Sequence, residues 1–248
     1  MRLKLGILIC DHLHPDLRSE FIDYPSMFGD IFNQVDPSLE LQFYFVIDGI
    51  FPKNINECDG YITSGSKSSV NDNVAWINRL EYLVRELYRA NIPFIGICFG
   101  HQLLAKALGG KVEKSKNGWG VGIHSSLLNV NKSWMKSKLK TIDLVVSHQD
   151  QITELPKHSQ VLAASEFCPF SMIQVGETFI GVQGHPEFTN EYSAALMQLR
   201  KNIIPGEVRE QGKKSFTKET NSLQITRWLI EFIRKTIVKQ SREKTDAT

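Results

Sequence analysis

The chain lacks long apolar runs, closely spaced cysteines and a large excess of either charge. None of its apolar runs approaches the ~20 residues that a membrane span requires, so we expect no membrane-spanning helix. Its four cysteines lie far apart without a C-x-x-C pair, which argues against a disulfide framework or a zinc site and favours a cytoplasmic protein with reduced thiols. A net charge of +2 gives no indication that nucleic acid or a membrane surface is a main partner.

The beginning of the chain, MRLKLGILICDHLHPD, combines basic residues with an apolar run, as a secretory signal peptide would. The apolar run from Leu5 to Cys10 stops at Asp11, however, and no small-residue cleavage site follows it. A run of this length is typical of a buried strand. We therefore expect the fold to begin with a strand at this point.

Short apolar runs alternate with helical patterns through the first half of the chain. In the segment 72–90, for example, apolar residues recur at threes and fours and so share one helix face. Strands that alternate with helices pair in parallel and are covered by those helices, which predicts an α/β fold with a doubly wound, mainly parallel sheet and flanking helices. The predicted strands are 3–10, 41–47, 60–64 and 92–98, and the predicted helices are 16–35, 72–90 and 101–110.

After Gly110 the pattern changes, because residues 111–185 contain several strand candidates and few helical runs. This predicts an antiparallel-rich second half that completes or flanks the sheet. Helical patterns return near 190–203 and 220–240, and the charged final stretch predicts a fraying helix with a loose tail. The chain carries no internal repeat or convincing linker, so we expect one compact domain.

The stretch IGICFGHQ, residues 95–102, places Cys98 between a buried strand and a helix, with Gly96 and Gly100 allowing a tight turn. A side chain at such a turn lies at the carboxyl edge of the sheet, where open α/β folds place their sites. There the helix N-terminus favours a thiolate, and the backbone N–H of Phe99 points to where an oxyanion would form. The alternative is a buried structural cysteine, but the two glycines and the helix start favour a nucleophile.

A thiolate nucleophile needs a base, and GVQGHPEF, residues 181–188, offers His185 and Glu187. Alternate residues of an extended chain point to the same side, and Pro186 favours extended backbone at His185. Glu187 is therefore expected to hold one imidazole nitrogen while the other faces the cysteine. Although a lone His-Pro-Glu is more often a surface turn, its combination with the Cys98 turn predicts a Cys-His-Glu catalytic triad.

The motifs GICFGHQ and QGHPEF resemble, in the right order, the two signature motifs of class I glutamine amidotransferase domains, the triad-type glutaminases. Within that family the chain is most similar to the stand-alone, GMP-synthetase-like branch that includes γ-glutamyl peptidases, through CDGYITSGSKSSVNDNVAWINRL and VSHQDQITELP. The resemblance implies a catalytic domain over residues 1–205. Residues 206–248 would form a helical extension with a charged tail, packed on that domain or trailing from it.

The resemblance also implies roles for residues outside the two motifs' reactive groups. The backbone N–H of Gly65 or Ser66 would supply a second oxyanion donor beside that of Phe99, and Gln102 would contact the glutamyl substrate. Further substrate contacts, mostly through the backbone, are implied for Ser147, His148 and Gln149.

The implied reaction is hydrolysis of a γ-glutamyl amide through a thioester on Cys98, without a metal or an organic cofactor. If ammonia leaves, the protein is a glutaminase that needs a separate ammonia-accepting synthetase subunit, because few residues follow the helix at 190–203. If an amino acid or peptide leaves, it is a stand-alone γ-glutamyl peptidase acting on glutathione-like compounds. The motifs slightly favour the amidotransferase, and a non-enzymatic or redox-sensing cysteine protein is a third alternative.

Other patterns in the chain suggest sites that we consider weaker. GYITSGSKS nearly matches a phosphate-binding loop, but Ser66 occupies the lysine position and a predicted strand takes the place of the loop. The cluster DHLHPD, residues 11–16, hints at a metal, yet no later cluster completes a ligand set. His148 is an alternative base that fits the triad less well than His185, and His101 is interpreted as a packing or orienting residue.

Overall fold

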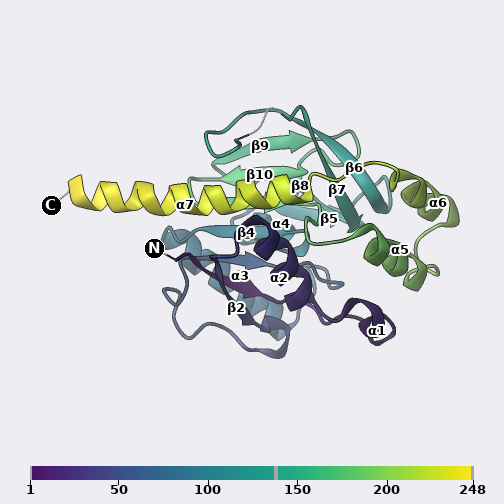
Figure 1. Cartoon of the computed structure of the whole chain (residues 1–248), viewed down its shortest axis with the longest axis horizontal. Helices are drawn as coiled ribbons and strands as arrows, with labels where there is room; N and C mark the ends of the chain where they lie inside the picture. The colour runs from purple at the N-terminus through teal and green to yellow at the C-terminus, as the bar shows by residue number, and fades with distance from the viewer. Residues whose placement is uncertain (1, 137–138, 247–248) are drawn as a thin grey trace.

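The computed structural model describes residues 2–136 and 139–246, and nine strands of this part form one sheet (Figure 1). In chain order, its strands are β1 (Lys4–Leu8), β2 (Glu40–Tyr44), β3 (Gly60–Thr63), β4 (Phe94–Ile97), β6 (Gly120–Leu128), β7 (Thr141–His148), β9 (Ser159–Ala164), β10 (Met172–Val175) and β11 (Phe179–Val182). Their order across the sheet is β2-β1-β3-β4-β11-β10-β9-β6-β7. Pairing is parallel from β2 to β11 and antiparallel from β11 to β7. The predicted α/β fold with an antiparallel second half is therefore confirmed.

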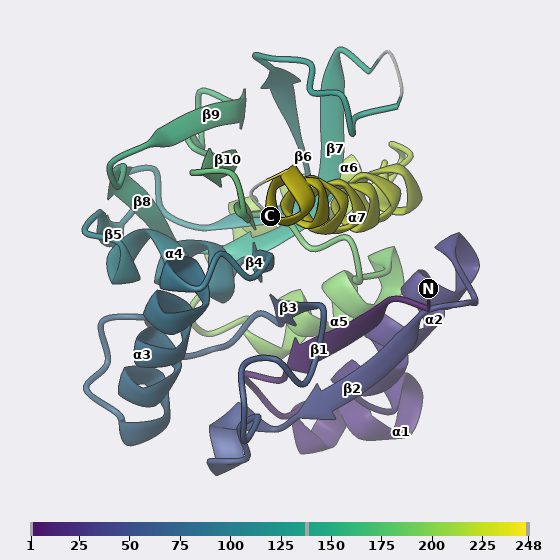
Figure 2. The ribbon, with the colours of Figure 1, turned by 90° about the vertical axis from the view of Figure 1, so that its left-hand side faces the viewer.

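Helices cover both faces of the parallel half (Figure 2). On one face lie α2 (Tyr24–Val35) and α7 (Ser222–Asp246), and on the other lie α3 (Ala75–Arg89) and α4 (Phe99–Ala107). A hydrophobic core lies on each face of the sheet, and residues of β1 contribute to both because successive side chains of a strand point to opposite faces. Leu5 and Ile7 belong to the core that includes α2, and Leu8 belongs to the core that includes α3.

The structure differs from the predicted elements in three places. The predicted helix over 16–35 is interrupted, since a short 3-10 turn (Pro15–Leu17) and α1 (Arg18–Phe21) end at Ile22, whose φ is 59°. Asp23 then caps α2 through the N–H of Ser26, which starts a separate helix. A small second sheet pairs β5 (Lys111–Lys114) with β8 (Asp150–Glu154). Helix α7 continues to Asp246, so the predicted loose tail is helical as far as the structure describes it.

The remaining helices lie beside the antiparallel half. Helix α5 (Asn190–Leu199) begins at Thr189, whose hydroxyl accepts a hydrogen bond from the N–H of Tyr192, and α6 (Gly206–Ser215) packs against β6. A further short 3-10 turn, Val46–Asp48, follows β2. Among the described residues no helix is both long and apolar enough to cross a membrane.

Candidate active site

Cys98 lies in the turn between β4 and α4, at the carboxyl edge of the parallel strands. Its backbone has φ 49° and ψ −96°, a region that side-chain-bearing residues rarely adopt. The turn is possible because Gly100 approaches β3 so closely that a Cβ there would overlap the hydroxyl of Thr63. Such strain, held in place by packing on both sides, is typical of nucleophile turns in α/β proteins.

The strand β11 brings the second motif to the same edge. Ile97 lies opposite Val182 in the parallel β4–β11 ladder, and the N–H of Cys98 donates to the carbonyl of Val182 at 2.8 Å. Three residues later the N–H of His185 donates to the carbonyl of Val145 in β7, also at 2.8 Å. Backbone pairing on both sides therefore fixes His185 beside the Cys98 turn.

His185 and Glu187 form a buried pair. Nδ1 of His185 lies 2.8 Å from Oε1 of Glu187, and the ring of Phe188 stacks on the imidazole at 3.9 Å with an interplanar angle of 5°. Burial by itself would lower the pKa of His185, but Cys98 and Glu187, through their charges and hydrogen bonds, raise it to about 10. The imidazole is thus protonated near neutral pH and lies between a sulfur and a carboxylate.

The loop after β3 packs against this imidazole. A Cβ placed on Gly65 would lie only 2.6 Å from Cε1 of His185, so no larger residue fits without a shift. On the other side of the turn, Phe99 is the first residue of α4, where backbone N–H groups have no partner within the helix. Ser66, Cys98 and Phe99 all line one cleft.

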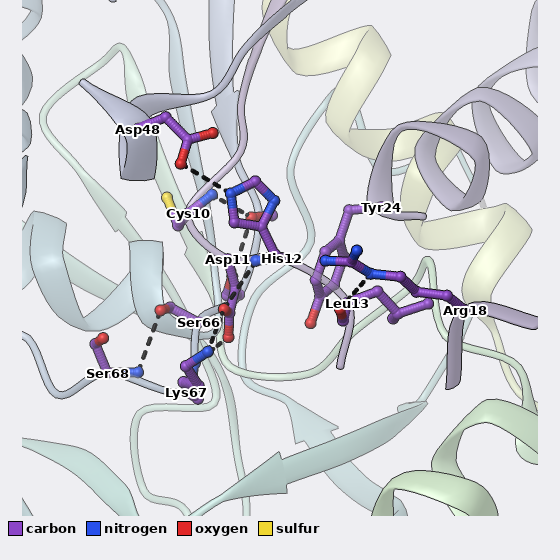
Figure 3. Close-up of polar contacts among 12 residues, drawn as sticks. Cys10, Asp11, His12, Leu13, Arg18, Tyr24, Asp48, Ser66, Lys67 and Ser68 are labelled. Atoms are coloured by element: carbon purple, nitrogen blue, oxygen red, sulfur yellow. Dashed lines mark hydrogen bonds and ion pairs between the residues drawn. The ribbon is translucent and has the colours of Figure 1, made fainter. Parts of the chain in front are cut away.

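Asp11, three residues beyond the end of β1, holds the loop after β3 in place (Figure 3). Its buried carboxylate accepts from the N–H of Lys67 at 2.8 Å and from the N–H of His12 at 2.8 Å, and it pairs with Nζ of Lys67 at 3.2 Å. From the sequence, Asp11 is identified only as the end of the first apolar run and as part of a possible metal cluster. Its position at the end of the first apolar run, at the edge of the sheet where the site lies, is the signal that could have identified it.

The cleft above Cys98 has a volume of about 730 Å³. One group of its lining residues, which we call the inner wall, comes from residues 66–69, 98–99, 102 and 147–150, and a second group, the outer wall, comprises Trp119, Arg200, Ile203, Pro205 and Val208. All four residues for which the family resemblance implied substrate contacts line this cleft: Gln102, Ser147, His148 and Gln149.

The side-chain amide of Gln102 is held by hydrogen bonds within the protein. Its Nε2 donates to the carbonyl of Asp150 at 2.8 Å and to Oε1 of Gln183 at 3.2 Å. Gln183 in turn donates from Nε2 to the sulfur of Cys98 at 3.5 Å. Gln183 is not among the site residues predicted from the sequence, although it belongs to the motif that contains His185.

The weaker candidates from the sequence lie away from these groups or are unsuited to proton transfer. Burial lowers the pKa of His101 to about 3 and that of His148 to about 3, which keeps both neutral. His12 pairs with Asp48 at 2.9 Å (Figure 3), and within the described residues no three His, Cys, Asp or Glu side chains are grouped to hold a metal.

Comparison with known proteins identifies the family to which a chain with this fold and these motifs belongs. The family model for class I glutamine amidotransferases matches residues 38–200. The chain belongs to the class I glutamine amidotransferase family, as its two motifs predicted, and this assigns it to a family of enzymes.

Within the family, the chain is 28% identical to γ-glutamyl peptidase 3 of Arabidopsis thaliana over 88% of its own length and 90% of that protein. It is 36% identical to the glutamine-hydrolysing GMP synthase of an Azoarcus species, over 57% of this chain and 28% of that protein. A glutamine amidotransferase structure from Thermotoga maritima superposes with a TM-score of 0.72 at 20% identity, covering 94% of this chain and 98% of that one. The last comparison shows a shared fold.

Proposed function

We propose that this protein is a stand-alone γ-glutamyl peptidase that cleaves γ-glutamyl amides through a triad of Cys98, His185 and Glu187. The observation that carries the proposal is the buried His185–Glu187 pair beside a strained cysteine turn at the floor of a cleft. A cleft of about 730 Å³ is of the size that takes drug-sized ligands, which suits a γ-glutamyl dipeptide or tripeptide better than glutamine alone.

In the first half of the proposed reaction, the Cys98 thiolate attacks the γ-carbonyl carbon and forms a C–S bond. The N–H groups of Phe99 and of the Gly65–Ser66 loop stabilise the negative oxygen of the tetrahedral intermediate, each such donor contributing about 3 kcal/mol. The protonated His185 then gives its proton to the leaving nitrogen as the C–N bond breaks. The raised pKa of His185 supports this role, since the imidazole begins the reaction with a proton to give.

In the second half, neutral His185 takes a proton from a water molecule as the water attacks the thioester. The C–S bond breaks, glutamate leaves, and the thiolate–imidazolium pair is restored. Glu187 keeps Nδ1 protonated and directed away from the sulfur throughout, so that Nε2 carries the transferred proton.

The leaving group decides between this activity and ammonia transfer. The match to γ-glutamyl peptidase 3 runs along nearly the whole of both chains, whereas the match to GMP synthase covers 28% of that protein. The second candidate, a glutaminase subunit that passes ammonia to a separate synthetase, is supported by the higher identity of the GMP synthase match.

Glutamate release from glutathione, a γ-glutamyl dipeptide and glutamine tests the proposal. We expect rapid release from the two peptides, slow release from glutamine, and loss of all release in Cys98→Ala. Cys58→Ala is the matched control, because Cys58 is as buried as Cys98 but packs in the core beside Tyr61. Release from glutamine alone would favour the ammonia-transferring subunit, and an unaffected Cys98→Ala variant would contradict both candidates.

A further inference from the structure

Arg200 projects into the cleft from the outer wall, at the C-terminal end of α5. Its Nη1 donates to Oγ of Ser147 at 2.9 Å, and its guanidinium carbon lies 5.8 Å from the ring centre of Trp119. These two contacts orient the group. A guanidinium carries five N–H donors, of which Ser147 takes one.

Arg200 differs from the other charged groups of the cleft in having no carboxylate beside it. Lys67 pairs with Asp11, and Lys114 stands opposite Asp150 in the β5–β8 register. In the described part of the chain, the arginines that form ion pairs are Arg85 and Arg234. A half-buried guanidinium without a counter-ion favours an anion from outside the chain, and a carboxylate matches its planar donors.

The guanidinium lies within reach of a short peptide bound at the triad. Ser147, its hydrogen-bond partner, is two residues beyond Val145 in β7, and alternate residues of a strand are about 6.7 Å apart. Val145 is the residue whose carbonyl accepts the N–H of His185. A carboxylate held by Arg200 would therefore lie about one residue away from the scissile bond.

The two parts of a γ-glutamyl peptide, the γ-glutamyl group (the head) and the leaving amino acid, carry different charged groups and so need different binding sites. The head carries both an α-ammonium and an α-carboxylate, so its site needs an acceptor as well as donors. The leaving amino acid uses its amine in the scissile bond and keeps only a carboxylate. A wall with a cation and no free carboxylate matches the leaving group, whereas Asp150 of the inner wall offers an acceptor for the head.

The outer wall is also apolar next to Arg200. Ile203 is 61% exposed, and Pro205 and Val208 line the same stretch of the cleft. Exposed apolar groups beside a cation suit an amino acid with an apolar side chain. We infer that Arg200 binds the terminal carboxylate of the leaving amino acid, with Trp119 and Ile203 against its side chain. This inference rests on the proposed peptidase function and extends it to the substrate's leaving group.

The test compares γ-glutamylvaline with γ-glutamylvalinamide, which differ only in the terminal carboxylate. For the unmodified enzyme we expect kcat/KM to be about tenfold higher with the acid, the size expected for one hydrogen bond to a charged group. Arg200→Met should abolish this preference by raising KM for the acid, with the amide unaffected, and Arg200→Lys should restore it in part. Lys201→Met is the matched control, because it removes the same charge from the next residue, which does not line the cleft.

Equal losses with both substrates in Arg200→Met would overturn the inference and assign Arg200 to the γ-glutamyl head, and no loss with either would overturn it too. Binding to the Cys98→Ala protein, measured by calorimetry, separates this result from the peptidase proposal. Tighter binding of the acid that depends on Arg200 supports the inference even if the unmodified enzyme cleaves neither compound. Equal binding of acid and amide overturns it independently of activity.

Discussion

The two walls of the cleft are built in different ways. The inner wall consists of strand ends and the turns that follow them, and two of its buried residues, Cys98 and Gln102, are both hydrogen-bonded to Gln183 behind it. The outer wall comes from the β5–β6 connection and the region from the end of α5 into α6, where Ile203 is largely exposed and Arg200 has no carboxylate partner within the described chain. Under the proposed function, reactivity depends on the sheet, whereas the choice of substrate depends on the segments added to it.

Apart from Cys98→Ala, the largest effect is expected from Glu187→Gln, in the buried pair beside the inner wall. This variant keeps the shape of the side chain but removes the charge that supports the protonated imidazole, so kcat should fall by about 10³-fold, within the range for acid–base catalysis. The initial rate of glutamate release checks this. A variant that keeps more than a tenth of the activity would remove Glu187 from the triad.

Gly65→Ala is expected to reduce kcat by roughly 100-fold, as a displacement of about 1 Å in a catalytic group does. The added methyl group would lie 2.6 Å from Cε1 of His185 and must displace the ring or the loop. Gly29→Ala is the control, because nothing lies within 4 Å of a Cβ at Gly29 in α2. Equal activity of the two variants would show that the loop and imidazole can separate without cost.

The pH dependence of stability should trace to the same buried pair of His185 and Glu187. The folded-state pKa of His185, about 10, lies above the ordinary value of 6.5, so its contribution to stability is complete below pH 6.5 and is lost as the pH rises to about 10. Between these values the unfolding free energy should decrease by up to about 1.4 kcal/mol per pH unit, the limit for one proton. Urea unfolding of the unmodified protein and of Glu187→Gln across this range should show a shallower decrease in the variant.

Asp11→Asn should reduce kcat by about tenfold, because the loop then loses one hydrogen bond to a charged group. KM should change little, since Asp11 lies outside the residues that line the cleft. Asp11→Glu, which keeps the charge, should recover part of the rate. A rise in KM with unchanged kcat would instead assign Asp11 to substrate binding.

The smallest effect is expected from the outer wall, with Ile203→Ser. A half-exposed contact gives a fraction of the ~0.8 kcal/mol per buried methylene, so KM for γ-glutamylvaline should rise by roughly threefold. The KM for γ-glutamylglycine and the unfolding free energy should stay unchanged. A loss of kcat comparable to that of the Glu187 and Gly65 variants would show that the outer wall takes part in the reaction as well as in binding.

Features that depend on neighbouring residues could be predicted from the sequence, whereas contacts between distant segments could not. The alternation of strands and helices, and the two glycines around Cys98, depend on local backbone geometry, which is why the fold could be predicted and Cys98 and His185 could be placed at one edge of the sheet. Asp11 and Gln183 make hydrogen bonds to segments far away in the chain, Asp11 to Lys67 and Gln183 to Cys98. A single sequence does not show which distant segments lie side by side, so these contacts could not be predicted. The helix predicted over 16–35 failed because the local cap at Asp23 outweighs the apolar periodicity.

One short ladder has a consequence for how such a chain can change over evolution. Four residue pairs, from Phe94–Phe179 to Ile97–Val182, join β4 to β11, and β11 is also where the sheet turns antiparallel. The segments between α4 and β11, apart from β7, can lengthen, shorten or change course while that ladder and the carbonyl of Val145 keep His185 beside Cys98. Under the proposed function, a lineage can thus acquire new substrates by altering its peripheral segments, while the residues beside β11, where the sheet becomes antiparallel, stay the same.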